Sequence, residues 1–347
     1  TVVAVDDVGR RLGELTVATG DEGHLRLVRW ATQWTDVAFA LEDCRHLTRR
    51  LEQDLLTAGH RVVRVPTKLM AAARRSNRRP GKSDPIDAEA VALAALRHPD
   101  LPVAELDGPA RDVKLLVDYR RSLVKQRTRV QSRVRWHLHE LDPELVVPSR
   151  GLRRYCVIDR LLEELAEQDG MVARLARCLL LRCRELTVEI NQLEVELRSL
   201  VRRLAPHLLG VPGCGVLSAA MILGETAGAH RFRSKDAYAR FTGTAPIPVW
   251  SGDRHGKVRL NRGGNRTINT ALHMIAITQV RGTGPGKAYV DKLQARGKTP
   301  TEALRLLRRR LSDTVFTALR RDEQQTLSPT SPPTQCSDSE PVLAQAG

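Results

Sequence analysis

Apolar residues alternate with polar ones over residues 1–20, with Asp7-Val8-Gly9 where the alternation breaks. That period of two, interrupted at a turn-forming triplet, predicts a β-hairpin. Residues 36–42 then form a short apolar run that ends in an acid, Glu42. A period of two at the start of the chain followed by a short apolar run indicates that the N-terminal part is built on strands.

Helical spacing follows this run and gives way to a second apolar run. Leu47, Leu51 and Leu55 recur at helical intervals, and Gly59 predicts the end of that helix. Residues 60–65 are again apolar and stop at Pro66. This strand–helix–strand order predicts a mixed α/β domain, which we place at residues 1–107.

Two long segments have an apolar residue every three to four positions, which predicts long helices at 109–141 and about 172–204. The first is basic on its other face, with Arg120, Arg121, Lys125, Arg127, Arg129, Arg133 and Arg135. The second has a heptad-like seam of Leu186, Ile190, Leu193, Leu197, Leu200 and Leu204. The pair predicts a coiled-coil region at 108–204, either antiparallel within the chain or between two chains.

The last third divides into a Gly- and Arg-rich segment, a helix and a polar tail. We expect a compact domain at 205–325, with a helix at about 301–321 whose Leu304, Leu307, Leu311 and Val315 face inward. Residues 326–347 are rich in Ser, Pro and Thr, which is typical of a disordered tail.

The charge balance indicates a polyanionic partner. Lys and Arg number 56 against 40 Asp and Glu, a formal net charge of +16, which favours nucleic acid because neutralised phosphates release counterions. No apolar run reaches the roughly 20 residues that span a bilayer, so we expect no membrane partner. The six cysteines form no Cys-x-x-Cys pair and read as free thiols in a reducing cytoplasm.

Two carboxylates stand three residues apart in Lys82-Ser83-Asp84-Pro85-Ile86-Asp87, where a helix is expected to begin with Pro85 at its first position. Asp84 and Asp87 would then lie near each other and supply hard oxygen ligands to a divalent metal. The alternative is structural, with Asp84 as the N-cap and Asp87 as its partner in a variant capping box. Glu42, at the end of a strand, is a weaker candidate of the same kind.

Two further segments carry candidate chemistry in the C-terminal third. In residues 209–219, Gly213 and Gly215 predict a helix-hairpin-helix turn whose backbone N–H groups can approach a phosphate, or else an ordinary helix connection. Residues 231–270 hold nine Lys or Arg against two Asp. There Ser251 is a candidate nucleophile toward a DNA phosphate, with arginines to neutralise developing charge, although a hairpin turn with a solvated basic rim fits equally.

These motifs together resemble the DEDD transposases of bacterial insertion sequences, the IS110 family, whose members are described as RNA-bridged recombinases. The resemblance covers nearly the whole chain and depends on the order and spacing of its blocks. The blocks are Ala40–Asp43, Gly59–Val63, Gly81–Ala90, Val211–Gly215, Arg231-Phe232, Ala245-Pro246, Ser251-Gly252 and Arg262–Arg266.

The resemblance implies a RuvC-like (RNase H-like) N-terminal fold, a helical coiled-coil middle and a mainly helical transposase domain. It assigns Glu42, Asp84 and Asp87 to the family acids that bind Mg²⁺, and Ser251 to the serine nucleophile. Nucleic-acid contacts are expected at Lys82, Gly213, Gly215, Arg254, Lys257, Arg259, Arg262, Asn265 and Arg266. The implied partners are DNA, a structured RNA encoded by the element, and a second copy through the coiled coil, in the bacterial cytoplasm at the nucleoid.

One family acid has no match in the chain. The family pattern places an aspartate on a first strand, whereas Thr1–Asp7 aligns best with the second strand, so we expect that aspartate upstream of Thr1. Two alternatives follow: a Holliday-junction nuclease of the RuvC type that uses the acids alone, and a decayed, non-catalytic nucleic-acid-binding protein.

Overall fold

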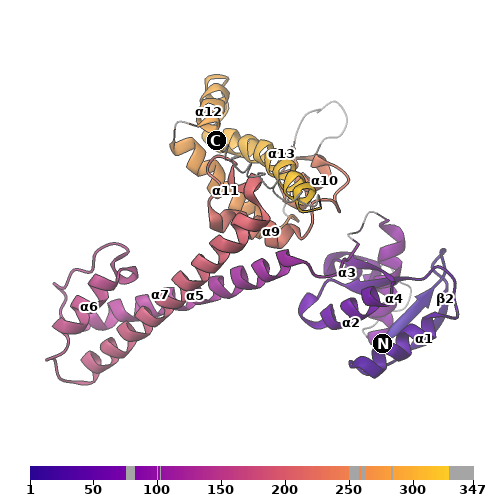
Figure 1. The fold of residues 1–347 in the computed structure, drawn as a ribbon, viewed down its shortest axis with the longest axis horizontal. Helices are drawn as coiled ribbons and strands as arrows, with labels where there is room; N and C mark the ends of the chain where they lie inside the picture. The colour runs from indigo at the N-terminus through magenta and orange to yellow at the C-terminus, as the bar shows by residue number, and fades with distance from the viewer. Residues whose placement is uncertain are drawn as a thin grey trace, which may run out of the picture. The chain divides into compact units, whose positions relative to one another are not determined.

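The computed structural model describes residues 1–75, 83–99, 101, 103–249, 258, 259, 261, 263–282 and 284–327. These residues divide into two compact units, Thr1–Pro109 and Ala110–Gly347, which are treated separately below (Figure 1). The expected three-part division of residues 1–325 stays a prediction.

The first unit has the expected hairpin and strand–helix–strand order. Its elements are β1 (Val2–Val5), β2 (Arg11–Leu15), α1 (Asp21–Ala31), β3 (Ala38–Glu42), α2 (Arg45–Thr57), β4 (Arg61–Val65), α3 (Thr67–Arg75) and α4 (Asp84–Arg97). β1 and β2 pair antiparallel, and β3 and β4 pair parallel, with Glu42 opposite Val65. Gly9 closes the hairpin at φ +85° and Gly59 follows α2 at +82°, conformations that glycine adopts without strain.

The core of this unit lies between the two strand pairs and their helices. Leu27, Leu55 and Val62 are buried together, and Val65, Ala90 and Ala94 form a second cluster under α4. α4 packs against β1, β3 and β4, so one helix bridges both small sheets. The described strands remain two separate pairs, so a continuous RuvC-like sheet is not confirmed and stays a prediction.

Two helices of the first unit were not anticipated. α1 buries Leu27 and Ala31 on one face and leaves Leu25 exposed, and α3 carries the basic residues Lys68, Arg74 and Arg75. α3 forms because Leu69, Met70 and Ala73 pack into the cluster beneath α4. Tertiary packing therefore stabilises a helix in a basic stretch for which the sequence pattern predicts none.

The second unit is helical. Its elements are α5 (Pro109–Leu141), a 3₁₀ turn (Gly151–Arg153), α6 (Tyr155–Glu164), α7 (Met171–Leu204), α8 (Pro206–Leu209), α9 (Val216–Thr226), α10 (Lys235–Phe241), β5 (Ile247–Pro248), β6 (Val258–Arg259), α11 (Arg266–Arg281), α12 (Pro285–Ala295) and α13 (Pro300–Leu327). The two long helices lie within a residue of their expected bounds. α13 runs on from its expected end at 321 to Leu327, and Asp322 in this extension is buried and accepts from the backbone of His207 and Leu208.

α5 and α7 pack antiparallel within the chain. Leu123 of α5 is buried with Leu186, Ile190 and Leu193 of α7, and Arg120 reaches Glu194 while Gln131 reaches Cys183. This part of the leucine seam is therefore filled within the chain, and pairing with a second copy stays a prediction. Coiled-coil packing itself is not confirmed.

One of the basic positions assigned to the open face of α5 was misplaced. Arg127 is 7% exposed and donates to Thr187 Oγ1 at 3.2 Å, in the layer between the two helices. Burial lowers the pKa of this guanidinium, with Arg153 adding to the effect. Arg127 is thus a buried polar contact between α5 and α7, a kind of contact that helps define one helix register.

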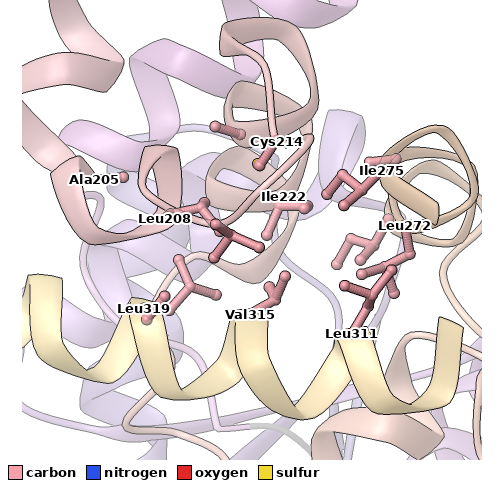
Figure 2. Close-up of a cluster of buried hydrophobic side chains, with 14 of the residues drawn as sticks. Ala205, Leu208, Cys214, Ile222, Leu272, Ile275, Leu311, Val315 and Leu319 are labelled. Carbon is pink, nitrogen blue, oxygen red and sulfur yellow. The ribbon is translucent and has the colours of Figure 1, made fainter. Parts of the chain in front are cut away.

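The core of the second unit joins α8, α9, α11 and α13, as Figure 2 shows for Leu208, Ile222, Ile275 and Val315. The inward set expected on α13 is confirmed, because Leu307, Leu311 and Val315 are buried and Leu304 is partly so. Within the described part of the chain, no helix has the length and hydropathy that a bilayer span requires.

Candidate functional site

The three candidate acids all lie in the first unit. Glu42 is the last residue of β3, and Asp84 and Asp87 are in the first turn of α4, the helix that packs on that strand. Parallel β3 and β4 end at the same edge, so this edge carries Glu42 by topology. The fold therefore places each acid at the end of an element, as expected.

The capping alternative for the aspartates is wrong. Ser83 is the N-cap of α4, and no side chain makes a cap hydrogen bond there. Asp84 is the first helical residue, which puts Pro85 second rather than first. Asp87 Oδ1 accepts from Arg74 Nη1 of α3 at 2.9 Å, so this carboxylate is held by a cation and not by the helix backbone.

The neighbourhood of Glu42 is acidic. Cys44 follows it closely, and its thiol pKa is raised by burial first and then by the carboxylate of Glu42, which also accepts a hydrogen bond from it. Asp43 adds negative charge at the same edge. A concentration of acids here repels further anions and attracts cations.

Metal binding at this edge is supported by donor chemistry and not by assembled geometry. Carboxylates are the oxygen ligands that a hard divalent cation prefers. The carboxylate of Asp87 accepts a positive partner here, the guanidinium of Arg74. Among the described residues, however, no three His, Cys, Asp or Glu side chains converge as a metal site would require. Arg74 was missed from sequence, since only the packing of α3 on α4 brings it to Asp87.

In the second unit, the glycine turn connects α8 to α9 as expected, although α8 has only four residues. Gly213, at φ +79°, packs against α11, where an added Cβ would meet the Ile275 carbonyl at 3.1 Å. Gln279 Nε2 donates to the Pro212 carbonyl at 2.6 Å. Gly215 differs, because it is the N-cap of α9 and nothing lies within 4 Å of its Cβ position. Both glycines are exposed, and contact with a phosphate stays a prediction for each.

The candidate serine lies in the sequence between β5 and β6. These two short strands pair antiparallel, Ile247 with Arg259 and Pro248 with Val258, so a hairpin is present. Ser251, Arg254, Lys257 and Arg262 lie outside the described residues, as does Lys82 of the first unit. Arg259 on β6 is described and exposed.

The return from this hairpin is fixed by a close backbone approach. An added Cβ on Gly264 would meet Gly243 Cα at 2.2 Å, so only glycine fits. Asn265 caps α11 by accepting from Ile268 N at 3.0 Å and donates to Glu225 Oε2 at 2.7 Å. Its amide is thereby committed within the fold, whereas Arg266 beside it is exposed. Nucleic-acid contact stays a prediction for both.

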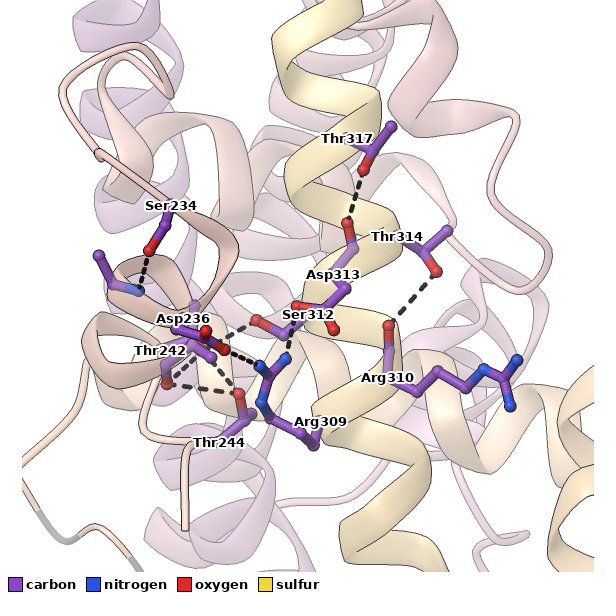
Figure 3. Close-up of polar contacts among 12 residues, drawn as sticks. Ser234, Asp236, Thr242, Thr244, Arg309, Arg310, Ser312, Asp313, Thr314 and Thr317 are labelled. Carbon is purple, nitrogen blue, oxygen red and sulfur yellow. Dashed lines mark hydrogen bonds and ion pairs between the residues drawn. The ribbon is translucent and has the colours of Figure 1, made fainter. Parts of the chain in front are cut away.

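Sequence reasoning missed an open groove of about 1000 Å³ between α8, α10 and α13. Lys235, Arg310 and Arg321 line it, and Figure 3 shows Arg310, Thr314 and Thr317 along α13. Asp313 also lines the groove but pairs with Arg309 at 2.5 Å, so the charge left there is positive. The signal in the sequence was faint: Arg310 and Arg321, eleven residues apart, share one face of a helix.

Two family models match the chain, and both describe transposases. Residues 1–143 match a DEDD-type model described as Transposase, and residues 205–291 match one described as Transposase IS116/IS110/IS902 family. The first contains the three candidate acids, and the second contains Ser251. Together they contain β3, α4 and the β5–β6 hairpin described above.

Curated proteins give the same result. The chain is 26% identical over 371 residues to the insertion element IS900 uncharacterized 42 kDa protein of Mycobacterium paratuberculosis, which covers 92% of each chain. It is 28% identical over 320 residues to the insertion element IS110 uncharacterized 43.6 kDa protein of Streptomyces coelicolor, covering 76% of this chain and 77% of that protein. A transposase for insertion sequence element IS1111A of Coxiella burnetii is 26% identical over 219 residues, 60% of this chain and 58% of that one. The chain belongs to the IS110 family of insertion-sequence transposases.

Proposed function

We propose that this transposase cuts and rejoins DNA through a serine nucleophile, Ser251, assisted by Glu42, Asp84 and Asp87. The observation that carries the proposal is the division of these residues between the two matched domains: the acids lie in one and the serine in the other. Glu42 ends β3, Asp84 and Asp87 are in the first turn of α4, and Ser251 comes between β5 and β6 in the sequence.

The chemistry is phosphoryl transfer. The Ser251 hydroxyl oxygen forms a bond to phosphorus, the backbone P–O bond breaks, and the leaving DNA hydroxyl takes up a proton. A phosphoserine link keeps the energy of the broken bond, so a hydroxyl of another strand can reverse the step without ATP. Arg254, Lys257, Arg259 and Arg262 would neutralise charge on the transferring group.

Mg²⁺ is the proposed cofactor, held by Glu42, Asp84 and Asp87. Bound there, the ion would polarise phosphate oxygens. Asp87 pairs with Arg74 at 2.9 Å, so an ion held by Asp87 would compete with this guanidinium for the carboxylate. Calorimetric titration tests this: Asp84→Ala and Asp87→Ala should weaken Mg²⁺ binding, Arg74→Ala should strengthen it, and unchanged binding in all three variants would remove the metal from the proposal.

A structured RNA encoded by the element is the proposed source of target choice. The net charge of +16 suits a second polyanion beside DNA, and aromatic residues make up only 3% of the chain, which gives few platforms for reading unpaired bases. Base pairing by an RNA would supply the sequence specificity that such a chain lacks. Co-purification of the protein with RNA transcribed from the flanks of its element tests this partner.

The decisive experiment traps the covalent intermediate. Full-length protein is incubated with labelled element-end DNA, and protein–DNA adducts are resolved on denaturing gels for wild type, Ser251→Ala and the control Ser199→Ala, an exposed serine of α7. We expect the adduct in wild type and the control only. Cleavage and recombination that persist in Ser251→Ala would favour a RuvC-type nuclease, and absence of both activities in wild type would favour a decayed binding protein.

A further inference from the structure

One face of α5 is free of contacts with the rest of its unit. The helix buries Leu123, Arg127, Gln131, Val134 and Leu138 against α7 and the elements packed on it. Lys125, Arg129 and Trp136 fall on the opposite side of the helix, and Arg133 lies on its flank. These four exposed residues are called the α5 row below.

The cations of the α5 row pair with none of the described acids. Nearby, Arg120 of α5 pairs with Glu194 of α7 at 2.5 Å, and Arg184 of α7 pairs with Asp159 of α6 at 3.0 Å. Lys125, Arg129 and Arg133 make no ion pair with any described acid, and no acid occurs in the sequence between Tyr119 and His139. Successive like charges four residues apart destabilise a helix. Nothing within the described fold offsets that repulsion, whereas an anion laid along the helix would.

An aromatic side chain ends the row. Trp136 is 70% exposed and makes no ring or cation contact with any described residue. An indole in water loses the burial that usually stabilises it, but its flat face is a platform on which an unpaired base can stack. The row thus presents three positive charges over about 12 Å of helix, followed by a stacking surface.

We propose that the α5 row binds an unpaired DNA strand, with phosphates along Lys125, Arg129 and Arg133 and one base on Trp136. A duplex keeps its bases stacked inside, so it would use the cations but not the indole. The inference rests on the proposed function in one respect: strand exchange exposes unpaired DNA for the row to hold.

The test measures binding of a fluorescein-labelled 20-nucleotide oligo(dT) to the full chain across a salt series. A triple variant, Lys125→Gln, Arg129→Gln and Arg133→Gln, should lower the slope of log affinity against log salt by about 2, since each contact to a single strand contributes roughly 0.7. The matched control is Arg198→Gln, an exposed arginine of α7 outside the row, which should leave the slope nearly unchanged.

The tryptophan is tested separately because stacking does not depend on salt. Trp136→Leu should weaken oligo(dT) binding roughly tenfold without changing the slope, and Trp136→Phe should restore most of the affinity. Oligo(dT) should quench indole fluorescence in wild type and much less in Trp136→Phe. A general loss of fold would change the salt slope, the oligo(dT) affinity and the circular dichroism spectrum together. A change of slope in the triple variant alone, and of affinity without slope in Trp136→Leu, would therefore identify the α5 row as the binding surface.

Three results would overturn the proposal. These are unaltered oligo(dT) binding in Trp136→Leu, tighter binding of oligo(U) or of a 20-base-pair duplex than of oligo(dT), and a change of oligomeric state on sedimentation of Trp136→Leu. The catalytic proposal can fail without the binding proposal for the α5 row, and the reverse also holds. Ser251→Ala should lose the DNA adduct while it binds oligo(dT) normally.

Discussion

Glu52 and Arg64 form a buried ion pair behind the strand edge that carries Glu42. Glu52 of α2 is 2% exposed, and its two carboxylate oxygens accept from Arg64 Nε and Nη2 of β4, both at 2.6 Å. Burial acts to lower the pKa of Arg64, but the hydrogen bonds that Arg64 donates to Glu52, together with the negative charge of Glu52, outweigh burial and hold the pKa above its usual value. We predict that Glu52→Leu is severely destabilising while the double variant Glu52→Leu, Arg64→Met is not.

The magnitude follows from the desolvation of the partner left behind. Removing Glu52 leaves the Arg64 guanidinium buried without its two charge-assisted hydrogen bonds, which costs about 3–5 kcal/mol. After Arg64→Met, the described ion pair left to Glu52 is the one with Arg49 at 4.0 Å, so this variant also destabilises, though less. Replacing both charges by apolar groups of similar volume removes the unpaired charge, and the double variant should lie within about 1 kcal/mol of wild type.

The assay is equilibrium urea unfolding followed by indole fluorescence. Trp30 and Trp34 lie edge to face at 4.7 Å in the first unit, so a background of Trp136→Phe and Trp250→Phe makes the emission report this unit alone. Both single variants, the double variant and the background protein complete a double-mutant cycle. A coupling free energy of at least about 2 kcal/mol is expected. Additive free energies, with the double variant the least stable of the four, would refute the reasoning.

Three further predictions concern the second unit. Asp322 is 3% exposed and accepts hydrogen bonds from the backbone N–H groups of His207 and Leu208 at 2.8 and 3.1 Å. Asp322→Ala should therefore lower the free energy of urea unfolding by about 2–4 kcal/mol, whereas the control Asp291→Ala, at an exposed position, should lower it by at most about 0.5 kcal/mol. Equal losses in the two variants would contradict this role of Asp322. Gly264→Ala should lower the thermal midpoint strongly, because the new Cβ would meet Gly243 Cα at 2.2 Å. Gly215→Ala should change the thermal midpoint little, because nothing lies within 4 Å of its Cβ position. The reverse order would mean that the backbones at Gly264 and Gly243 are not in close contact. Burial raises the pKa of the Cys214 thiol to about 12, so this thiol stays protonated at pH 8 and should resist iodoacetamide. The exposed Cys156 and Cys178 should be modified, and peptide mass spectrometry would distinguish the three sites. Rapid labelling of Cys214 would contradict its burial.

Periodicity was enough for the long elements and failed where packing overrides local charge. α5 and α7 match their expected ranges because dozens of residues keep one helical spacing. α3 was missed because a basic run carries no such signal until α4 offers it a face to pack on. Arg127 was assigned to the wrong side of α5. A long side chain can lie in a buried layer when a hydrogen-bond acceptor is present, and Thr187 supplies that acceptor.

The candidate site divides in the same way. Residue types and order led to Glu42, Asp84, Asp87 and Ser251, and the family comparison places them in two transposase domains. The pairing of Asp87 with Arg74 was invisible in the sequence, because thirteen residues and a change of helix separate them. The same holds for the groove of Lys235, Arg310 and Arg321, whose members come together only when α13 folds against α10.

By itself, the sequence determined the strand and helix periods, the excess of positive charge and the family, since these depend on residue types at short or fixed spacings. Only the tertiary structure decided which charges are partnered. It buried Arg127 and joined Glu52 to Arg64, yet left Lys125, Arg129 and Arg133 open on α5. The reason is physical: a charge is stabilised or left exposed by what lies within a few ångströms of it, and for most of these residues those neighbours are distant in the chain.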